Sequence, residues 1–308
     1  VRGLGQRLAA ASERPNLPWT FRVVDDPVIN AFALPGGFVY VTRGILAYFN
    51  SEAELVSVLG HEIGHVTARH GVKQYSRAQL AGLGLGLGSI LVPQVARFGQ
   101  LAETALGLVF LKYGRDDETQ SDQLGVEYAQ SAGYDAKAGT RFFEVLDRMS
   151  QESGQSLPGW LSTHPNPGDR VQRTHDLALG GQARFPGADR VAEAGHKHRV
   201  DGVVFGDDPR QGFLEGQVFK HPSLRFQLDF PSGWQVQNSP GAVMAGEPNR
   251  GAMLQLTLEK SEGLSPRAYA ARVAQSAQAT VAAGAAESIH GFEAYVATAL
   301  AERERGES

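Results

Sequence analysis

Two histidines one helical turn apart, with a glutamate next to the first, form the run HEIGH at residues 61–65. On a helix, His61 and His65 differ by about 40° around the axis, so both imidazoles can bind one cation. Glu62 points to the side, toward the water that such a cation would activate. This spacing is typical of zinc peptidases, and it predicts a hydrolytic zinc centre.

The surrounding residues predict a tightly packed helix. Its apolar residues form one stripe that faces away from the histidines, made of Leu55, Leu59, Ile63 and Val66. Gly60 and Gly64 each weaken a helix by about 1 kcal/mol relative to alanine, and the close approach of another backbone would explain them. Ser51, with Glu54 three residues later, predicts where the helix begins. The alternative, two solvated histidines on an amphipathic helix, leaves both glycines unexplained.

A peptidase zinc centre needs a third protein ligand. His70 would lie on the opposite face of a continuing helix from the first histidine, and Ala68 and Gly71 stand where the metzincin pattern has glycine and histidine. The segment 113–135 is a better source, because it predicts a helix that is acidic at its start and closed by a glycine.

One stripe of this second helix carries two carboxylates followed by two small residues, namely Glu118, Asp122, Gly125 and Ala129. Such a stripe suits a helix that packs closely on the HEIGH helix and supplies one ligand and one hydrogen-bond acceptor. We therefore predict that Glu118 binds zinc and that Asp122 holds a ligand histidine. The alternative is a solvated acidic face, for which Asp116 and Asp117 are equally ordinary candidates.

Together these residues resemble the gluzincin zinc metallopeptidase family of the CAAX prenyl endopeptidase, HtpX and BepA. The resemblance covers residues 1–180, and it rests on NAFALPGGFVYVTRGIL at 30–46, HEIGHVTARH at 61–70, the pair Glu118 and Asp122, and LSTHPNPGDR at 161–170. It implies that Glu118 is the third zinc ligand and that Asp122 supports the centre. The chain departs from the family's usual ExEAD, since it reads ETQSD.

The resemblance also implies that the loop with His164 lies in the active-site cleft. Two prolines stiffen this loop, at positions 165 and 167. His164 would then either stabilise the oxyanion or occupy the fourth zinc position and keep the enzyme latent. The alternative is a loop histidine that only helps to pack the domain. Arg170 is predicted to anchor the loop through a salt bridge.

Two short runs before the catalytic helix, 21–24 and 38–41, are rich in β-branched and aromatic residues and predict paired strands. In metallopeptidases of this kind an edge strand beside the zinc helix binds the substrate backbone. We therefore assign substrate binding to Gly37, Phe38 and Val39, with a plain structural hairpin as the alternative.

Composition is that of a soluble protein of 308 residues with a net charge of −4, which argues against nucleic-acid binding. The length predicts two domains. The chain has no cysteine, which excludes thiolate ligands and disulfides. Because it begins at Val1, we expect a fragment whose signal peptide has been removed, and the family resemblance favours the periplasm.

The apolar run LAGLGLGLGSILV at 80–92 is too short to span a membrane, which takes about 20 residues. We predict that this run and a helical stretch at 95–112 cover or gate the cleft. Peripheral membrane contact, or contact with envelope proteins, is the lesser alternative.

Residues 181–212 are predicted to be a linker, with HKHR at 196–199 as a solvated face rather than a metal or anion site. Residues 213–308 alternate apolar and polar positions over several strands, with a helix at 266–283 and a helix-like run at 297–307. This module is weakly similar to PsbP-like domains and is predicted to be truncated at its C-terminus.

The predicted fold is therefore an α+β, helix-rich zincin-type peptidase domain with a small sheet, followed by a smaller α/β or α+β domain. The predicted activity is endopeptidase hydrolysis of polypeptides with one zinc per chain, held by His61, His65 and Glu118, and with Glu62 as the proton carrier. The predicted setting is envelope protein quality control. The alternative is a chaperone-like binding protein for unfolded envelope proteins, in which proteolysis is latent or rare.

Overall fold

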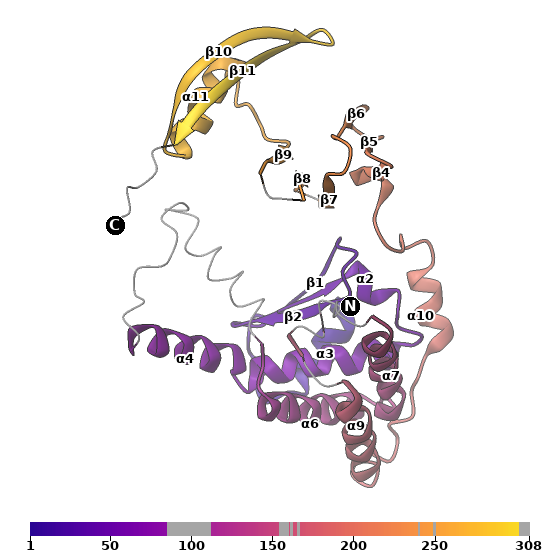
Figure 1. Ribbon diagram of the computed structural model, residues 1–308. Coiled ribbons are helices and arrows are strands. Elements are labelled where there is room, and N and C mark those ends of the chain that lie inside the picture. The colour runs from indigo at the N-terminus through magenta and orange to yellow at the C-terminus, as the bar shows by residue number, and fades with distance from the viewer. Residues whose placement is uncertain are drawn as a thin grey trace. The chain divides into compact units, whose positions relative to one another are not determined.

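The computed structural model describes residues 1–84, 112–153, 160, 163–164, 167–239, 241–248 and 251–301 (Figure 1). The chain divides into two compact units, the first ending at Leu228 and the second beginning at Asp229 among the described residues. The segments predicted to cover the cleft, 80–92 and 95–112, lie almost wholly outside the described residues. The fold class is mixed α+β, as the sequence predicts.

The first unit holds a three-stranded sheet of β1 (Thr20–Val24), β2 (Ala31–Leu34) and β3 (Phe38–Thr42), in the order β1-β3-β2. Strand β1 pairs with β3 in parallel, which confirms the predicted pairing of these two runs. Strand β2 pairs with β3 antiparallel. The turn between them uses Gly36 and Gly37 at φ values of 97° and 95°, which side-chain-bearing residues rarely adopt.

The predicted edge position of Gly37, Phe38 and Val39 is wrong. Because β3 lies in the middle of the sheet, its backbone groups already bond to β1 on one side and to β2 on the other. The sequence pattern missed β2 because this strand has only four residues and leads directly into the turn. The edges of the sheet are β1 and β2.

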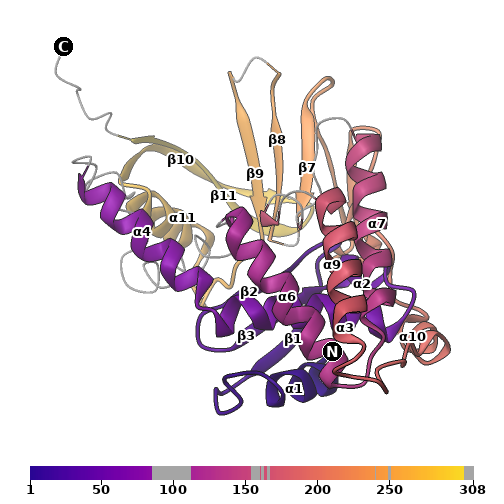
Figure 2. The same ribbon diagram turned by 90° about the horizontal axis from the view of Figure 1, so that it is seen from below.

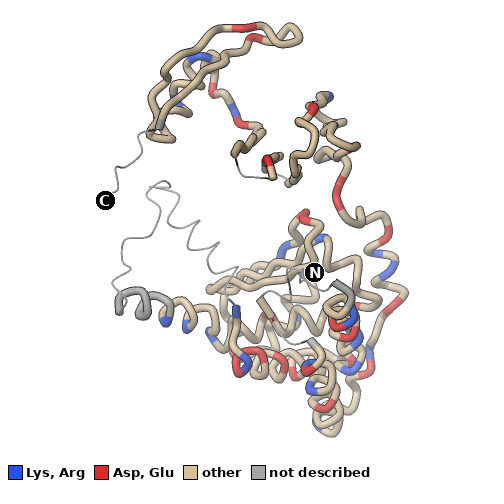
Figure 3. Tube along the Cα trace, in the orientation of Figure 1, with Lys and Arg blue, Asp and Glu red and all other residues tan. Residues whose placement is uncertain are grey.

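The helices of the first unit are seen in Figures 1 and 2: α1 (Arg2–Ala10), α2 (Arg43–Leu46), α3 (Glu52–Thr67), α4 (His70–Gly84), α6 (Arg115–Ser131), α7 (Ala136–Ser153), α9 (Pro167–Gly181) and α10 (Glu193–Val200). Helix α3 is central, because it packs on α1, α6, α7 and β2. Acidic and basic residues are interspersed along the outer helices (Figure 3). Within the part of the chain that the structure describes, no helix is long and apolar enough to cross a membrane.

Helix α3 begins as predicted. The Ser51 hydroxyl accepts a hydrogen bond from the Glu54 backbone N–H at 3.2 Å, and the Glu54 carboxylate accepts one from the Asn50 N–H at 3.1 Å. The predicted apolar stripe is buried, but so is the opposite face with its histidines. The helix therefore lies inside the unit, with its polar residues enclosed by other elements.

The two glycines of α3 mark its crossing with α6. A Cβ atom added to Gly60 would lie 2.9 Å from the carbonyl oxygen of Gly125, and one added to Gly125 would lie 2.8 Å from the His61 nitrogen. A Cβ atom added to Gly64 would lie 3.2 Å from backbone atoms of Ser121. The predicted close approach of a second backbone is confirmed, and it brings the acidic start of α6 against the histidines.

The segment predicted to be a linker packs on the first unit. Arg190 and Arg199 form ion pairs with Glu52, the first residue of α3, and the Arg43 side chain donates to the carbonyls of residues 204 and 206. Within HKHR, His196 is buried and the other three residues are exposed. Residues 213–229 form a sheet of β4 (Phe213–Glu215), β5 (Val218–His221) and β6 (Phe226–Asp229).

The second unit contains a sheet of β7 (Gln235–Ser239), β8 (Ala242–Gly246) and β9 (Met253–Thr257), then α11 (Pro266–Ser276) and a hairpin of β10 (Ala279–Ile289) and β11 (Phe292–Ala301). The predicted helices at 266–283 and 297–307 are corrected: the first ends at Ser276, and residues up to Ala301 continue a strand. Pairing between β10 and β11 outweighs the helix propensity of their alanines.

We predict that Gly125→Ala destabilises the protein by about 1–3 kcal/mol, because the added methyl group would overlap backbone atoms of α3 and force the helices apart. Gly180→Ala is the matched control, since this helical glycine has nothing within 4 Å of the added Cβ. The control should be neutral or more stable by up to about 1 kcal/mol. Urea unfolding measures both, and equal stability of the two variants would contradict the close crossing.

Candidate metal centre

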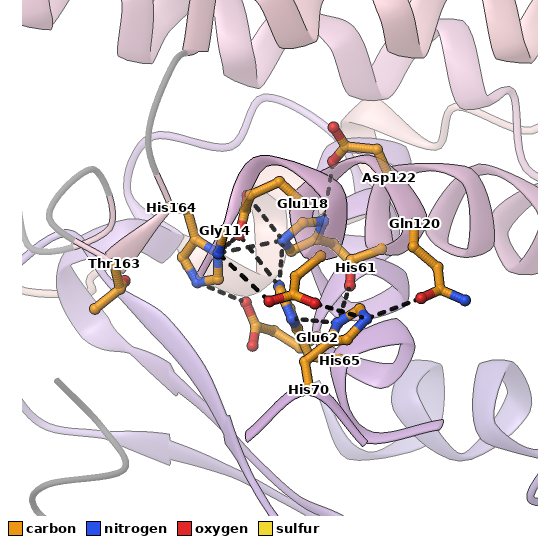
Figure 4. Close-up of polar contacts among 12 residues, drawn as sticks. His61, Glu62, His65, His70, Gly114, Glu118, Gln120, Asp122, Thr163 and His164 are labelled. Atoms are coloured by element: carbon orange, nitrogen blue, oxygen red, sulfur yellow. Dashed lines mark hydrogen bonds and ion pairs between the residues drawn. The ribbon is translucent and has the colours of Figure 1, made fainter. Parts of the chain in front are cut away.

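Four buried side chains point their ligand atoms at one another: His61, His65, Glu118 and His164 (Figure 4). These atoms all lie within 4.8 Å of one another, and no member is more than 2% exposed. The Nε2 atoms of His61 and His65 are 2.9 Å apart, and Nδ1 of His164 lies 3.0 Å from Oε1 of Glu118. The structure thus brings together the predicted zinc ligands and adds His164 to them.

Two helices and the segment that holds His164 position the four members of the cluster. Helix α3 presents His61 and His65 one turn apart, and the first turn of α6 presents Glu118. The His164 backbone N–H donates to the Trp160 carbonyl at 2.8 Å, and the Thr163 carbonyl accepts from Tyr113 at 3.2 Å. The segment that carries His164 is therefore fixed to Tyr113, two residues before the start of α6.

Two aromatic side chains that sequence reasoning missed stack on the ring of His164. Its centroid lies 4.1 Å from that of Trp160 and 5.4 Å from that of Tyr113, with near-parallel planes. Tyr113 also stacks on His65 at 3.8 Å. These rings hold His164 in a defined orientation, with Nδ1 toward Glu118 and Nε2 at 3.5 Å from Glu62. No short-range pattern in the sequence marks either aromatic residue for this position.

Glu62 lies beside the cluster and is completely buried. Burial raises its pKa to about 7, against the opposing charge of His164. A backbone contact from Ala33 of β2 also lowers this pKa, although neither carboxylate oxygen accepts a hydrogen bond of normal geometry from the described residues. A carboxylate with a pKa near neutrality can both accept and return a proton.

Behind His61 lies a buried charge network. Asp122 Oδ1 is 3.0 Å from Nδ1 of His61, and the same carboxylate accepts from Arg170 at 2.6 Å and from Arg173 at 2.5 Å. Arg170 also lies 3.0 Å from Glu118. Burial alone would raise the pKa of Asp122 and Glu118. Arg170, together with His61 at Asp122 and His164 at Glu118, instead holds both pKa values below their usual ranges.

Behind His65 lies a second histidine, His70. The two Nδ1 atoms are 3.0 Å apart, and Nε2 of His70 is 3.0 Å from the Gln120 side-chain oxygen and 3.5 Å from Asp117. His70 lies outside the cluster of potential ligands, and it faces the nitrogen of His65 that points away from this cluster. Such a partner fixes the tautomer of a ligand histidine. Sequence reasoning excluded His70 as a ligand and missed this role.

The residues of the cluster fit a zinc ion. Two imidazoles and a carboxylate are the ligand set of catalytic zinc centres, and His164 supplies a fourth atom in reach. Burial lowers the pKa of His61 to about 4 and that of His65 well below its usual value, so both imidazoles are neutral and can bind a cation at neutral pH. The nearby carboxylates Glu62, Glu118 and Asp122 favour a cation as well.

A helix that carries HExxH, crossed by a second helix that carries a carboxylate, is the arrangement of a zinc metallopeptidase. The chain belongs to peptidase family M48, whose profile matches residues 1–178. This confirms the family resemblance predicted from the sequence.

Curated relatives match just over half of this chain. The beta-barrel assembly-enhancing protease of Escherichia coli (strain K12) is 34% identical over 189 residues, which cover 58% of this chain and 38% of the relative. The mitochondrial metalloendopeptidase OMA1 of Arabidopsis thaliana is 34% identical over 161 residues, which cover 51% of this chain and 31% of the relative. That of Schizosaccharomyces pombe is 32% identical over 174 residues, covering 56% and 50%. The match thus spans half or less of the length of these relatives.

We expect the purified protein to bind about one zinc ion per chain and Glu118→Ala to lose it, because the variant keeps only two strong ligands from the helices. Asp116→Ala is the matched control, since Asp116 lies in the same first turn of α6 but outside the cluster. Elemental analysis after dialysis measures both. Retention of zinc in Glu118→Ala with loss in Asp116→Ala would overturn the ligand assignment.

The residues behind the histidines should have smaller effects. Asp122→Ala and His70→Ala each remove the partner that orients one imidazole, so each should weaken zinc binding about tenfold to a hundredfold. Competition with a chelating dye measures the affinity. His175→Ala, which removes a half-exposed histidine, is the control and should leave the affinity unchanged.

Proposed function

We propose that this protein is a zinc-dependent endopeptidase that hydrolyses peptide bonds, with His61, His65 and Glu118 as zinc ligands and Glu62 as the proton carrier. The observation that carries the proposal is the position of Glu62. It lies next to a buried cluster of four potential ligands, with its pKa raised by burial to about 7. Membership of peptidase family M48 supports the same conclusion.

Zinc, when bound, supplies the positive charge that activates a water molecule and polarises the scissile carbonyl. Glu62 accepts a proton from the attacking water and returns it to the leaving amine, a role for which a pKa near 7 is suitable. Asp122 and Arg170 hold His61, while His70 holds His65. The substrate carbonyl would therefore meet a centre whose ligands are already oriented.

Strand β2 is the element on which an extended substrate would bind. It is an edge of the sheet, it packs on α3, and its residue Ala33 contacts Glu62 through the backbone. An extended peptide adds to such an edge through main-chain hydrogen bonds, which tolerate many sequences. This replaces the assignment to β3.

Glu62→Gln should abolish peptide hydrolysis and leave zinc content and thermal stability close to those of the wild type, because the amide keeps the shape of the side chain but cannot carry the proton. Hydrolysis of casein and elemental analysis measure the two properties. Glu144→Gln, on the exposed face of α7, is the matched control and should keep full activity. Activity of Glu62→Gln within a few-fold of the wild type would refute the role.

We propose that the position of His164 sets whether the enzyme is active or latent. Its Nδ1 lies within the ligand cluster, and every member of the cluster is buried. This supports a latent form in which His164 takes the fourth ligand position. Its Nε2, at 3.5 Å from Glu62, also suits a residue that moves aside and stabilises the oxyanion.

The two roles of His164 predict opposite results for His164→Ala. Loss of a fourth ligand should raise the rate of casein hydrolysis, whereas loss of an oxyanion donor should lower it about a hundredfold. We expect the rate to rise, because Nδ1 points at the ligands. An unchanged rate would mean that His164 only helps to pack the domain. Zinc content is measured alongside, since a rise in rate requires that the metal stays bound.

We further propose that the protein acts in the periplasm on envelope proteins during quality control. The similarity to the beta-barrel assembly-enhancing protease of Escherichia coli supports this setting, although the OMA1 relatives carry a mitochondrial name. A chaperone-like role with rare proteolysis is the second candidate, favoured by the enclosed position of His164. Binding of unfolded envelope proteins by Glu62→Gln, compared with turnover by the wild type, separates the two functions.

A further inference from the structure

A cavity lies next to the metal centre, on the side of His65 and Tyr113. Its volume is about 250 Å³. Its wall is formed by the end of β2 and the turn after it, the last turn of α3 and the first residues of α4, with Arg14 from the loop after α1. The cavity therefore adjoins both the metal centre and the end of β2, the edge strand proposed above to bind the substrate.

The charged side chains that the structure describes in this cavity are cationic. Arg14 and Arg69 both line it, beside the polar side chains of His65 and Tyr113, and none of the described lining residues is a carboxylate. Arg69 is exposed and Arg14 is half-buried, and in the described ranges neither guanidinium forms an ion pair or a side-chain hydrogen bond. The remaining wall includes the apolar side chains of Leu34, Val66 and Val72. Two unneutralised guanidinium groups above an apolar wall match a carboxylate on a short methylene stem.

Arg69 reaches this position through an uncommon backbone conformation. It lies between α3 and α4 with φ at 61°, in the left-handed region where glycine or asparagine is usual. A left-handed arginine costs about 1 kcal/mol or more relative to glycine at such a helix end. An arginine therefore stands where glycine is favoured, and its side chain lines the cavity.

We propose that this cavity is a subsite that selects substrates with an acidic side chain, Asp or Glu, near the scissile bond, and that Arg14 and Arg69 bind its carboxylate. The proposal rests on the proposed peptidase function, because it takes the peptide to lie along β2. Strand residues advance by about 3.3 Å each, so the acidic residue lies within a few positions of the cleaved bond. The apolar wall contacts the methylene groups, and the guanidiniums supply the charge-assisted bonds.

The experiment uses the full chain and a set of quenched fluorescent peptides that are identical except for Glu, Gln or Lys at one position, moved along the sequence. We expect kcat/KM for Glu to exceed that for Gln by about tenfold or more at one position, and that for Lys to be lowest. In the double variant Arg14→Gln, Arg69→Asn the ratio of Glu to Gln should fall to about one. Asparagine is chosen because it tolerates the left-handed backbone.

Two controls make the outcome specific. Arg22→Gln removes an exposed arginine of the other edge strand and should keep the full Glu preference. The pair Arg14→Lys, Arg69→Lys keeps both charges and should keep part of it, which separates loss of charge from misfolding. Equal rates for Glu and Gln peptides in the wild type, or an unchanged ratio in the double Gln/Asn variant, would overturn the subsite.

Failure of the subsite is distinguished from failure of the peptidase function by binding. The Glu62→Gln variant is titrated with the fluorescent Glu and Gln peptides, and anisotropy gives the two dissociation constants. Tighter binding of the Glu peptide, lost in the background of the double Gln/Asn variant, supports the subsite even if the wild type cleaves nothing. Cleavage by the wild type without any preference for Glu leaves the peptidase function standing and rejects the subsite.

Discussion

The backbone-to-backbone crossing of α3 and α6 is the constraint on which the metal centre depends. Gly60 and Gly125 meet without side chains between them, and Gly64 lies against Ser121 in the same way. Only at this separation can Glu118, at the start of α6, reach the imidazoles of α3. The helix propensity lost at each glycine, about 1 kcal/mol, is offset by packing and by the ligand geometry that the crossing permits.

Charge balance is the second consequence of this crossing. It brings Glu62, Glu118 and Asp122 together in the interior, and Arg170 is the fully buried cation among them. An isolated buried carboxylate is costly, and removing one partner of a buried ion pair typically costs about 3–5 kcal/mol. Arg170 therefore holds the ligands in place. A divalent cation would neutralise the negative charge of the carboxylates that Arg170 leaves uncompensated.

The start of the catalytic helix is held by a segment far along the chain. Glu52 stands at the first turn of α3 and pairs with Arg190 and Arg199, while the Tyr134 hydroxyl donates to the same carboxylate. The ion pairs of Glu52 with these two arginines hold the distant segment against the start of α3. Residues well beyond 180 thus belong physically to the first unit, and the division of the chain falls only at Leu228.

Chemistry within one element could be predicted from the sequence, because the helical period alone determines which residues share a face. His61 with His65, Glu118 with Asp122, and the cap at Ser51 are spacings of this kind. The glycines of α3 and the acidic stripe of α6 also predicted that these two helices meet. Other contacts between elements could not be predicted, because they depend on strand order and helix crossing. Strand β2 displaced β3 from the sheet edge. The sequence left the role of His164 open, and the tertiary structure brings it into the ligand cluster from a segment 99 positions beyond His65. His70 was placed behind His65 by a new helix that begins there, and pairing of β10 with β11 overrode the alanine-rich helix signal. Tertiary packing decides such cases, since it outweighs the small free energies of local preference.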